Sequence, residues 1–271
     1  MNRALVRKRK RVNIGEKLYK VESFEPLIGK NNVKPHTLIV GTMPSITSHG
    51  TSQYYGHRSN AFWWIVGDAL NFRRGGQHID KKWPFQFGFN KDGKPSKVQA
   101  PILKALKDTK RFGEGGGPIL SYEKQVERIH ENGYILWDVL QFAEIINSDD
   151  NSIKKEIPND VLGLLSRYPT LNRIVFASGG KSASLFKSSN KIALNKLLSS
   201  KKPPYHFISG NDAANNIFKT NNFLKNQPNT SRAIELIVPI SVSPAAASKT
   251  FQEKSNNWME LVFNKKPLYS I

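Results

Sequence analysis

Two adjacent tyrosines, a histidine and an asparagine lie within seven residues of one another, at positions Tyr54, Tyr55, His57 and Asn60. Aromatic rings of this kind stack on flat ligands, and tyrosine also carries a hydroxyl that can form a hydrogen bond. The imidazole and the carboxamide can donate and accept hydrogen bonds. This stretch therefore has the contents of a ligand-binding loop.

The elements on either side of the loop can be read from hydrophobic patterning. An apolar run predicts a buried strand over residues 37–42, and it stops at the turn signal Gly41-Thr42-Met43-Pro44. Apolar residues spaced by three and four predict a helix over about 60–70, so Phe62 and Trp63 are better interpreted as packing than as ligands. In an α/β protein, ligands bind beyond the carboxyl ends of the strands, which is where this loop begins.

The whole stretch resembles the first motif of the uracil-DNA glycosylase superfamily, and most closely that of the hypoxanthine-DNA glycosylase branch. That motif is a strand followed by Gly-Ser/Thr-x-Pro, a serine-rich turn, Tyr-Tyr and a helix entered through Asn-x-Phe-Trp. The matching residues here are Gly41 to Pro44, Ser45 to Ser48, Tyr54-Tyr55 and Asn60 to Trp63. Order and spacing both agree.

A second segment resembles the second motif of the same superfamily. Residues 234–239 read as the last strand, residues 240–248 form a turn of small and hydroxyl residues, and a closing helix carries Phe251, Lys254 and Trp258. Small residues allow the backbone to approach DNA closely, and hydroxyls can bind phosphates. Such a turn is also common without that role, but its order after the first motif favours the functional interpretation.

Two further strands are predicted between these motifs. The branch has a Gly-x-x-Leu-Trp-Asp-Val segment similar to the strand and turn at 133–139, followed by an acidic turn that we expect at 150–153. Asp138 could orient a catalytic group, but helix capping alone explains it, so we do not assign it the catalytic step.

The other predicted strand, 173–177, leads into Ser178-Gly179-Gly180-Lys181 and a helix, which is the pattern of a possible anion site. A phosphate-binding loop of nucleotide hydrolases would need glycine where Val175 stands, so that class is disfavoured. In the resembling branch this turn carries Asn-Gly, and the asparagine reads the extruded base. Ser178 takes that place here, which puts a hypoxanthine or uracil substrate in doubt.

The composition favours a nucleic-acid partner. The 271 residues include 41 Lys+Arg against 21 Asp+Glu, a formal net charge of +20, although a merely soluble lysine-rich surface would look similar. Cysteine is absent and the six histidines are scattered, so we expect no cofactor and no metal, unlike the iron–sulfur branches of the superfamily. No apolar stretch reaches the length of a membrane span, and we expect a cytoplasmic protein, nucleoid-associated if prokaryotic.

We expect a three-layer α/β/α fold with a central, mainly parallel four-stranded sheet, as in uracil-DNA glycosylases. Residues 1–35 are expected to be a basic extension, either an arm on the phosphate backbone or a solvated tail. Residues 36–271 would form one glycosylase-like domain, with insertions at about 72–118 and 187–232. Aromatic residues in the first insertion suit either base stacking or a small satellite core, and a short helix is plausible at 100–107.

The resemblance implies a role for each matched residue. Asn60 would be catalytic, holding the water that attacks the sugar, although helix capping explains an asparagine there equally well. The residues expected to bind the extruded base are Met43, Pro44, Tyr54, Tyr55, His57, Ser178 and Gly179. The residues expected to contact DNA are Ser45, Ser48, Lys181, Ser241, Ser243, Pro244, Ala245, Ala246 and Ser248.

The implied activity is that of a monofunctional DNA glycosylase, which extrudes a base from single- or double-stranded DNA and leaves an abasic site. We expect this enzyme to be a monomer. The substrate is either a deaminated base, hypoxanthine or uracil, or a bulky modified pyrimidine of foreign (phage) DNA. These alternatives correspond to repair and to defence. A non-catalytic DNA- or RNA-binding protein that keeps the fold is the competing class.

Overall fold

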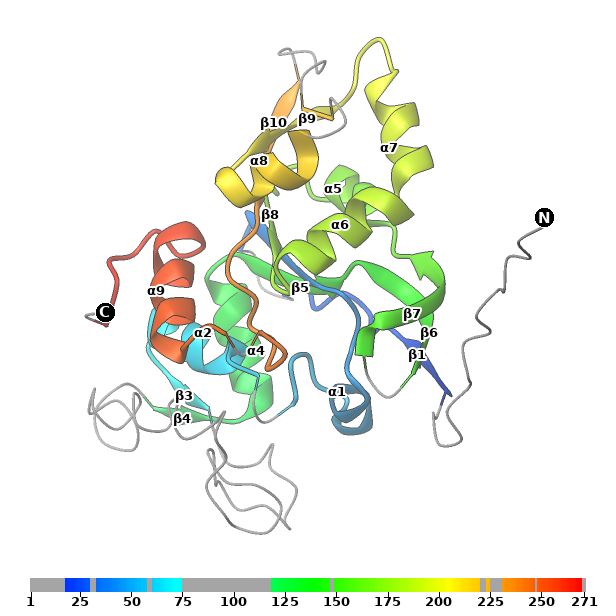
Figure 1. Ribbon diagram of the computed structural model, residues 1–271. Coiled ribbons are helices and arrows are strands. Elements are labelled where there is room, and N and C mark those ends of the chain that lie inside the picture. Colours follow the sequence, from blue (N-terminus) through cyan, green and yellow to red (C-terminus); the bar gives the residue numbers. More distant parts are fainter. Residues whose placement is uncertain are drawn as a thin grey trace, which may run out of the picture.

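The centre of the molecule is a parallel five-stranded sheet in the order β5-β2-β8-β10-β9 (Figure 1). The computed structural model describes residues 18–29, 33–57, 60–74, 118–146, 149–219, 223–224, 231–246 and 248–269. The strands are β2 (Thr37–Gly41), β5 (Tyr134–Asp138), β8 (Arg173–Phe176), β9 (Tyr205–Ser209) and β10 (Arg232–Ile237). The expected α/β/α class with a parallel sheet is confirmed.

The central strands are apolar because both faces of the sheet are covered. Every residue of β2 and of β5 is buried, so neither strand shows the alternation of a half-exposed sheet. β2 pairs with β5 on one side and with β8 on the other, in the registers Gly41 to Asp138 and Val40 to Phe176. The strand order therefore reverses at β2, and a crevice opens beyond the carboxyl ends of the strands at such a point.

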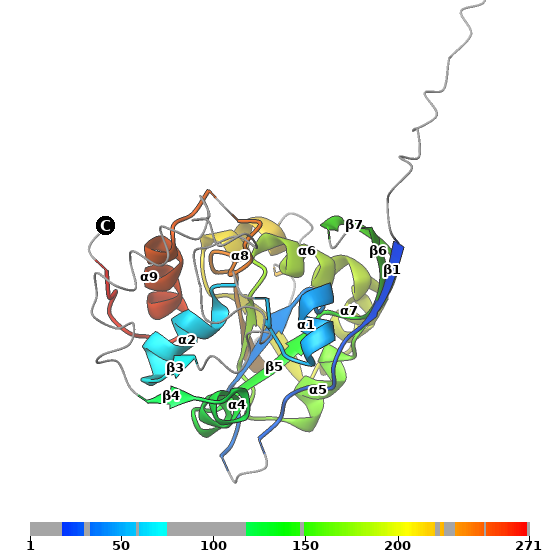
Figure 2. The ribbon, with the colours of Figure 1, turned by 90° about the horizontal axis from the view of Figure 1, so that it is seen from below.

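Helices cover the two faces of this sheet (Figures 1 and 2). On one side lie α2 (Phe62–Leu70), α4 (Tyr122–Glu131) and α9 (Phe251–Leu261), and α2 contacts both of the others. On the other side lie α5 (Val161–Arg167), α6 (Gly180–Ser189), α7 (Lys191–Leu198) and α8 (Asp212–Lys219). In the described part of the chain, no helix is both long and apolar enough to span a bilayer.

A small antiparallel sheet flanks the main one. Its order is β1-β6-β7, with β1 (Leu18–Glu22), β6 (Leu140–Ile146) and β7 (Asp149–Pro158). The end of the expected N-terminal extension is thus part of the packed structure, since Val21 is buried. The turn expected at 150–153 was wrong, because these residues belong to β7. The Ser152 hydroxyl accepts from the Ile146 N–H at 2.7 Å, which fixes the hairpin.

The sheet has five strands where four were expected, and the additional one is β9. It lies within the segment 187–232 that was interpreted as an insertion, and it forms the edge of the sheet by pairing with β10 alone. Two short strands, β3 (Arg73–Arg74) and β4 (Ile119–Leu120), pair with each other. Residues 75–117, with the helix expected at 100–107 and its neighbouring aromatic residues, lie outside the described residues, as do residues 1–17.

Candidate active site at the carboxyl ends of the strands

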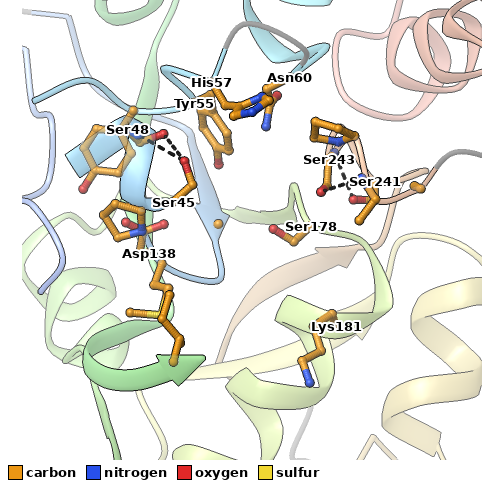
Figure 3. Close-up of a pocket in the computed structure, with 18 residues that line it drawn as sticks. Ser45, Ser48, Tyr55, His57, Asn60, Asp138, Ser178, Lys181, Ser241 and Ser243 are labelled. Atoms are coloured by element: carbon orange, nitrogen blue, oxygen red, sulfur yellow. Dashed lines mark hydrogen bonds between the residues drawn. The ribbon is translucent and has the colours of Figure 1, made fainter. Parts of the chain in front are cut away.

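A cavity of about 510 Å³ opens beyond the carboxyl ends of β2, β5 and β8 (Figure 3). Its walls come from the loops that follow β2, β8 and β10, which are the segments to which the sequence motifs were assigned. The ends of β2 and β5 and one residue of β6 complete the lining. The lining residues are Gly41, Met43, Pro44, Ser45, Ser48, Tyr54, Tyr55, His57, Asn60, Asp138, Ile145, Ser178, Lys181, Ser241, Ser243, Pro244, Ala245 and Ala246.

Backbone hydrogen bonds of a single residue, Val242, join three of these segments. Its carbonyl accepts from the Ala61 N–H at 3.0 Å, and its own N–H donates to the Ala177 carbonyl at 3.1 Å. Ala61 precedes α2 and Ala177 ends the β8 segment, so the turn after β10 is tied to both. The two motif loops, far apart in the sequence, therefore form opposite walls of one cavity.

The turn after β8 is held close to the turn after β10. Gly179 has φ +64°, a left-handed conformation that favours glycine. A Cβ at this position would lie 3.3 Å from the Ser241 side chain and 3.4 Å from the Pro239 carbonyl oxygen. A larger residue would therefore push these two turns apart.

Serine hydroxyls shape the loop after β2. Ser45 caps the short helix α1 (Ile46–Thr51), because its side chain accepts from the Ser48 N–H at 3.1 Å. The buried Ser48 hydroxyl accepts from the Gly56 N–H at 3.0 Å and from the Ser45 hydroxyl. Both side chains therefore already have a structural role in holding the loop against the cavity.

The two tyrosines have different environments. Tyr54 is buried, and its hydroxyl donates to the carbonyls of Phe24 and Glu25 at 3.1 and 3.2 Å, so it fastens the N-terminal segment to the loop. The Tyr55 ring lies against Phe62 with ring centroids 4.0 Å apart. The Tyr55 hydroxyl is buried without a hydrogen-bond partner among the described residues, and burial raises the pKa of this phenol well above its usual range. It therefore stays protonated.

Asn60 occupies the entrance to α2. Its side-chain oxygen accepts from the Phe62 N–H at 2.9 Å, a local turn bond that starts the helix, and its backbone N–H donates to the His57 carbonyl at 2.9 Å. The expected N-cap role of Asn60 was wrong, because the N-cap of α2 is Ala61 and Asn60 instead makes a turn bond one residue earlier. Figure 3 shows the Asn60 and His57 side chains together, across the cavity from Lys181. An amide oxygen has two lone pairs, so the helix bond leaves capacity for one further donor.

The turn after β10 is built from its own hydroxyls and from α9. Ser241 accepts from the Ser243 N–H and Ser243 accepts from the Ala245 N–H, both at 3.2 Å. The buried Lys254 of α9 donates to the Ser243 carbonyl at 3.0 Å, and burial lowers the pKa of this lysine. Lys254 thus attaches the turn after β10 to α9.

Comparisons with known proteins agree with this arrangement of motifs. No family model matches the sequence. A hypoxanthine DNA glycosylase of Methanosarcina acetivorans is 27% identical over 139 residues, 51% of this chain and 61% of that protein. One from Methanosarcina barkeri is 24% identical over 163 residues, 60% of this chain and 73% of that protein. The sequence is thus similar to hypoxanthine DNA glycosylases, in agreement with its resemblance to the uracil-DNA glycosylase superfamily.

The sequence and structure also resemble one solved structure. The solution NMR structure of a candidate uracil DNA glycosylase from Methanosarcina acetivorans has 21% sequence identity and a TM-score of 0.49. The alignment covers 90% of this chain and 97% of that chain. The match to the first of the two curated relatives spans less than two thirds of that relative's length.

Most of the residues that sequence analysis assigned to the site line this cavity, and two do not. Gly179 lines a neighbouring hollow between α6 and α8, and Ser248 is exposed outside the cavity. Among the described residues, no group of three or more His, Asp or Glu side chains gathers in a way that could hold a metal.

Three lining residues were not assigned to the glycosylase site in advance: Gly41, Asp138 and Ile145. Asp138 is only 2% exposed, and its Oδ2 accepts from the Ser23 hydroxyl at 3.2 Å. Its position at the end of a predicted strand was a signal, but helix capping offered an equal explanation. The capping explanation was wrong, since Asp138 is followed by the strand β6.

Proposed function

We propose that this protein is a monofunctional DNA glycosylase that extrudes a base from DNA, binds it in the cavity and hydrolyses its N-glycosidic bond. The observation that carries the proposal is the joining of the two motif loops around one cavity by Val242. The names of the two curated relatives support the same reaction class.

The side chains at the cavity suit a dissociative cleavage of the N-glycosidic bond. The sugar becomes an oxocarbenium-like cation as the base departs, so the attacking water needs orientation more than a strong base. In this proposal the second lone pair of the Asn60 oxygen holds that water, while the first keeps the helix start in place. The water's oxygen then bonds to the anomeric carbon, and the base leaves with the bonding electron pair and takes up a proton.

The proposed DNA contacts follow from charge and from the rim of the cavity. The formal net charge of +20 attracts the phosphate backbone, and Lys181 lines the cavity together with Ser241 and Ser243. Tyr55 is the better candidate to contact the base, because Tyr54 is anchored to the N-terminal segment. We propose that the protein acts on DNA as a monomer, inside the cytoplasm.

Two substrate classes remain within the proposal. A deaminated base, hypoxanthine or uracil, is favoured by the names of the relatives and would mean repair. A bulky modified pyrimidine of foreign DNA is favoured by Ser178, which leaves more room than an asparagine would, and would mean defence.

The test is base release from oligonucleotides that each carry one candidate base, followed by alkaline cleavage of the abasic strand. Strand scission at the modified position supports the proposal. If none of the oligonucleotides is cleaved while the protein still binds them, the chain is a non-catalytic DNA-binding protein that has kept the fold.

A further inference from the structure

Asp138 stands at the base of the cavity in a position that the strand register determines. It is the parallel neighbour of Gly41, the last residue of β2. A Cβ at Gly41 would lie 2.5 Å from the Asp138 Oδ1 and 3.3 Å from the Tyr55 hydroxyl oxygen. Both groups therefore approach the same point on β2, and only a glycine leaves room for them.

The carboxylate is held in a defined orientation. Its Oδ2 accepts from the Ser23 hydroxyl at 3.2 Å, and its backbone carbonyl accepts from the Asn159 side chain at 3.0 Å. Burial, and to a smaller extent the nearby Asp138 carboxylate, raises the pKa of Tyr54 and of Tyr55. The carboxylate lines the cavity proposed for base binding beside the Tyr55 hydroxyl, which is buried without a hydrogen-bond partner among the described residues, so a base bound there is expected to contact both groups.

We propose that Asp138 determines which base this site accepts, by taking a hydrogen bond from an N–H group on the edge of the extruded base. This proposal rests on the proposed glycosylase function. An ionised carboxylate can only accept hydrogen bonds, whereas the protonated Tyr55 hydroxyl can donate to an acceptor beside that N–H. The two groups together complement an edge with a donor next to an acceptor.

Bases differ in what surrounds such an N–H group. In hypoxanthine the N1–H has one carbonyl neighbour and one C–H neighbour, and the amino group of cytosine has a ring nitrogen on one side only. In uracil and thymine the N3–H lies between two carbonyl oxygens. The carboxylate would repel both of these oxygens. The site is therefore expected to accept hypoxanthine or a cytosine-type base and to reject uracil and thymine.

The experiment compares wild-type protein with Asp138→Asn in single-turnover excision. The probes are otherwise identical duplexes with hypoxanthine, cytosine, 5-hydroxymethylcytosine, glucosylated 5-hydroxymethylcytosine or uracil at one position. Wild-type protein should favour hypoxanthine or at least one of the cytosine-type bases over uracil by about ten- to a hundredfold, the range for one good base-edge contact. Asp138→Asn should lose most of that preference, since its amide can donate to a uracil carbonyl.

Two variants separate this role from a structural one. Asp160→Asn makes the same chemical change at the start of α5, where the side chain accepts from the Gly163 N–H at 2.9 Å, and it should leave base preference unchanged. Tyr55→Phe removes only a hydroxyl that has no partner in the described part of the chain, so it should fold normally. It should slow excision of the preferred base by roughly three- to tenfold, the effect of one ordinary hydrogen bond.

Four results would count against the inference. Uracil released by wild-type protein at least as fast as every other base would do so while leaving the proposed function intact. An equal loss on all bases in Asp138→Asn would mean that the carboxylate acts on water or on folding. Release of no base from any duplex would overturn the proposed function as well. If Asp138→Asn melts well below wild type, the test passes to Tyr55→Phe. The inference then fails if Tyr55→Phe releases every base at the wild-type rate and keeps the wild-type base preference.

Discussion

Asn60 has one role that the structure shows and a second that we propose, and substitutions can separate them. Its side-chain oxygen accepts from the Phe62 N–H at 2.9 Å, which stabilises the start of α2. The proposed role is to hold the attacking water through the same amide. Alanine removes both functions, whereas serine retains an oxygen that can form the local turn bond but has no amide.

The stability effect can be estimated from the single hydrogen bond. Asn60→Ala should cost about 1 kcal/mol, the usual net contribution of one intramolecular bond. For a chain of this size that corresponds to a fall in Tm of about 2–4 °C. Asn60→Ser should stay within about 0.5 kcal/mol of wild type, since serine can form the same local side-chain to backbone bond.

The effect on catalysis should be much larger in both variants. Loss of one group that stabilises the transition state typically lowers the rate by about 10²- to 10³-fold. Single-turnover base release should therefore fall by that factor in Asn60→Ser and in Asn60→Ala, while DNA affinity, measured by fluorescence anisotropy, changes little. Base release by Asn60→Ser at the wild-type rate would refute the proposed role and leave Asn60 as a helix-start residue only.

Two other perturbations test the packing behind the site. Gly41→Ala places a Cβ 2.5 Å from the Asp138 Oδ1, so we expect a loss of about 1–3 kcal/mol in urea unfolding and loss of base release. Gly50→Ala, where a Cβ would meet nothing within 4 Å, is the control and should lower neither property. Burial lowers the pKa of His130 below 6.5, and its ring donates to the Leu27 carbonyl at 2.9 Å. The unfolded chain binds that proton more readily, so stability should fall as pH drops below about 6.5. His130→Gln should make the decline of Tm with acidity shallower, and an unchanged decline would show that other groups cause it.

The parts of the fold that were predicted correctly are those whose pattern is set by burial on two sides. The strands β2, β8 and β10 are short apolar runs ended by turn residues, and α2 has apolar residues at a helical spacing. β9 was missed because it is an edge strand with the sequence YHFIS, in which Ile208 is 42% exposed. Its strand conformation depends on pairing with β10, which local sequence does not reveal.

The turn expected at 150–153 failed for a related reason. Asp149–Pro158 is rich in polar residues and reads as a loop, but it is the outer strand of an antiparallel sheet and pairs only with β6. Much of such a strand faces solvent and needs no apolar pattern. The local signal for a turn was therefore weaker than the tertiary pairing.

The site shows the same division between local and long-range information. Asn60 and the serines could be assigned because motif order and spacing are local properties of the chain. Asp138 could not be assigned, because its place beside Gly41 arises only when β5 pairs in parallel with β2. Val242 left no local signal at all, since it joins the motif loops through backbone atoms that every residue type has. Two motifs thus supply most of the side chains of this cavity, but strand order determines its geometry and places Asp138 beside Gly41.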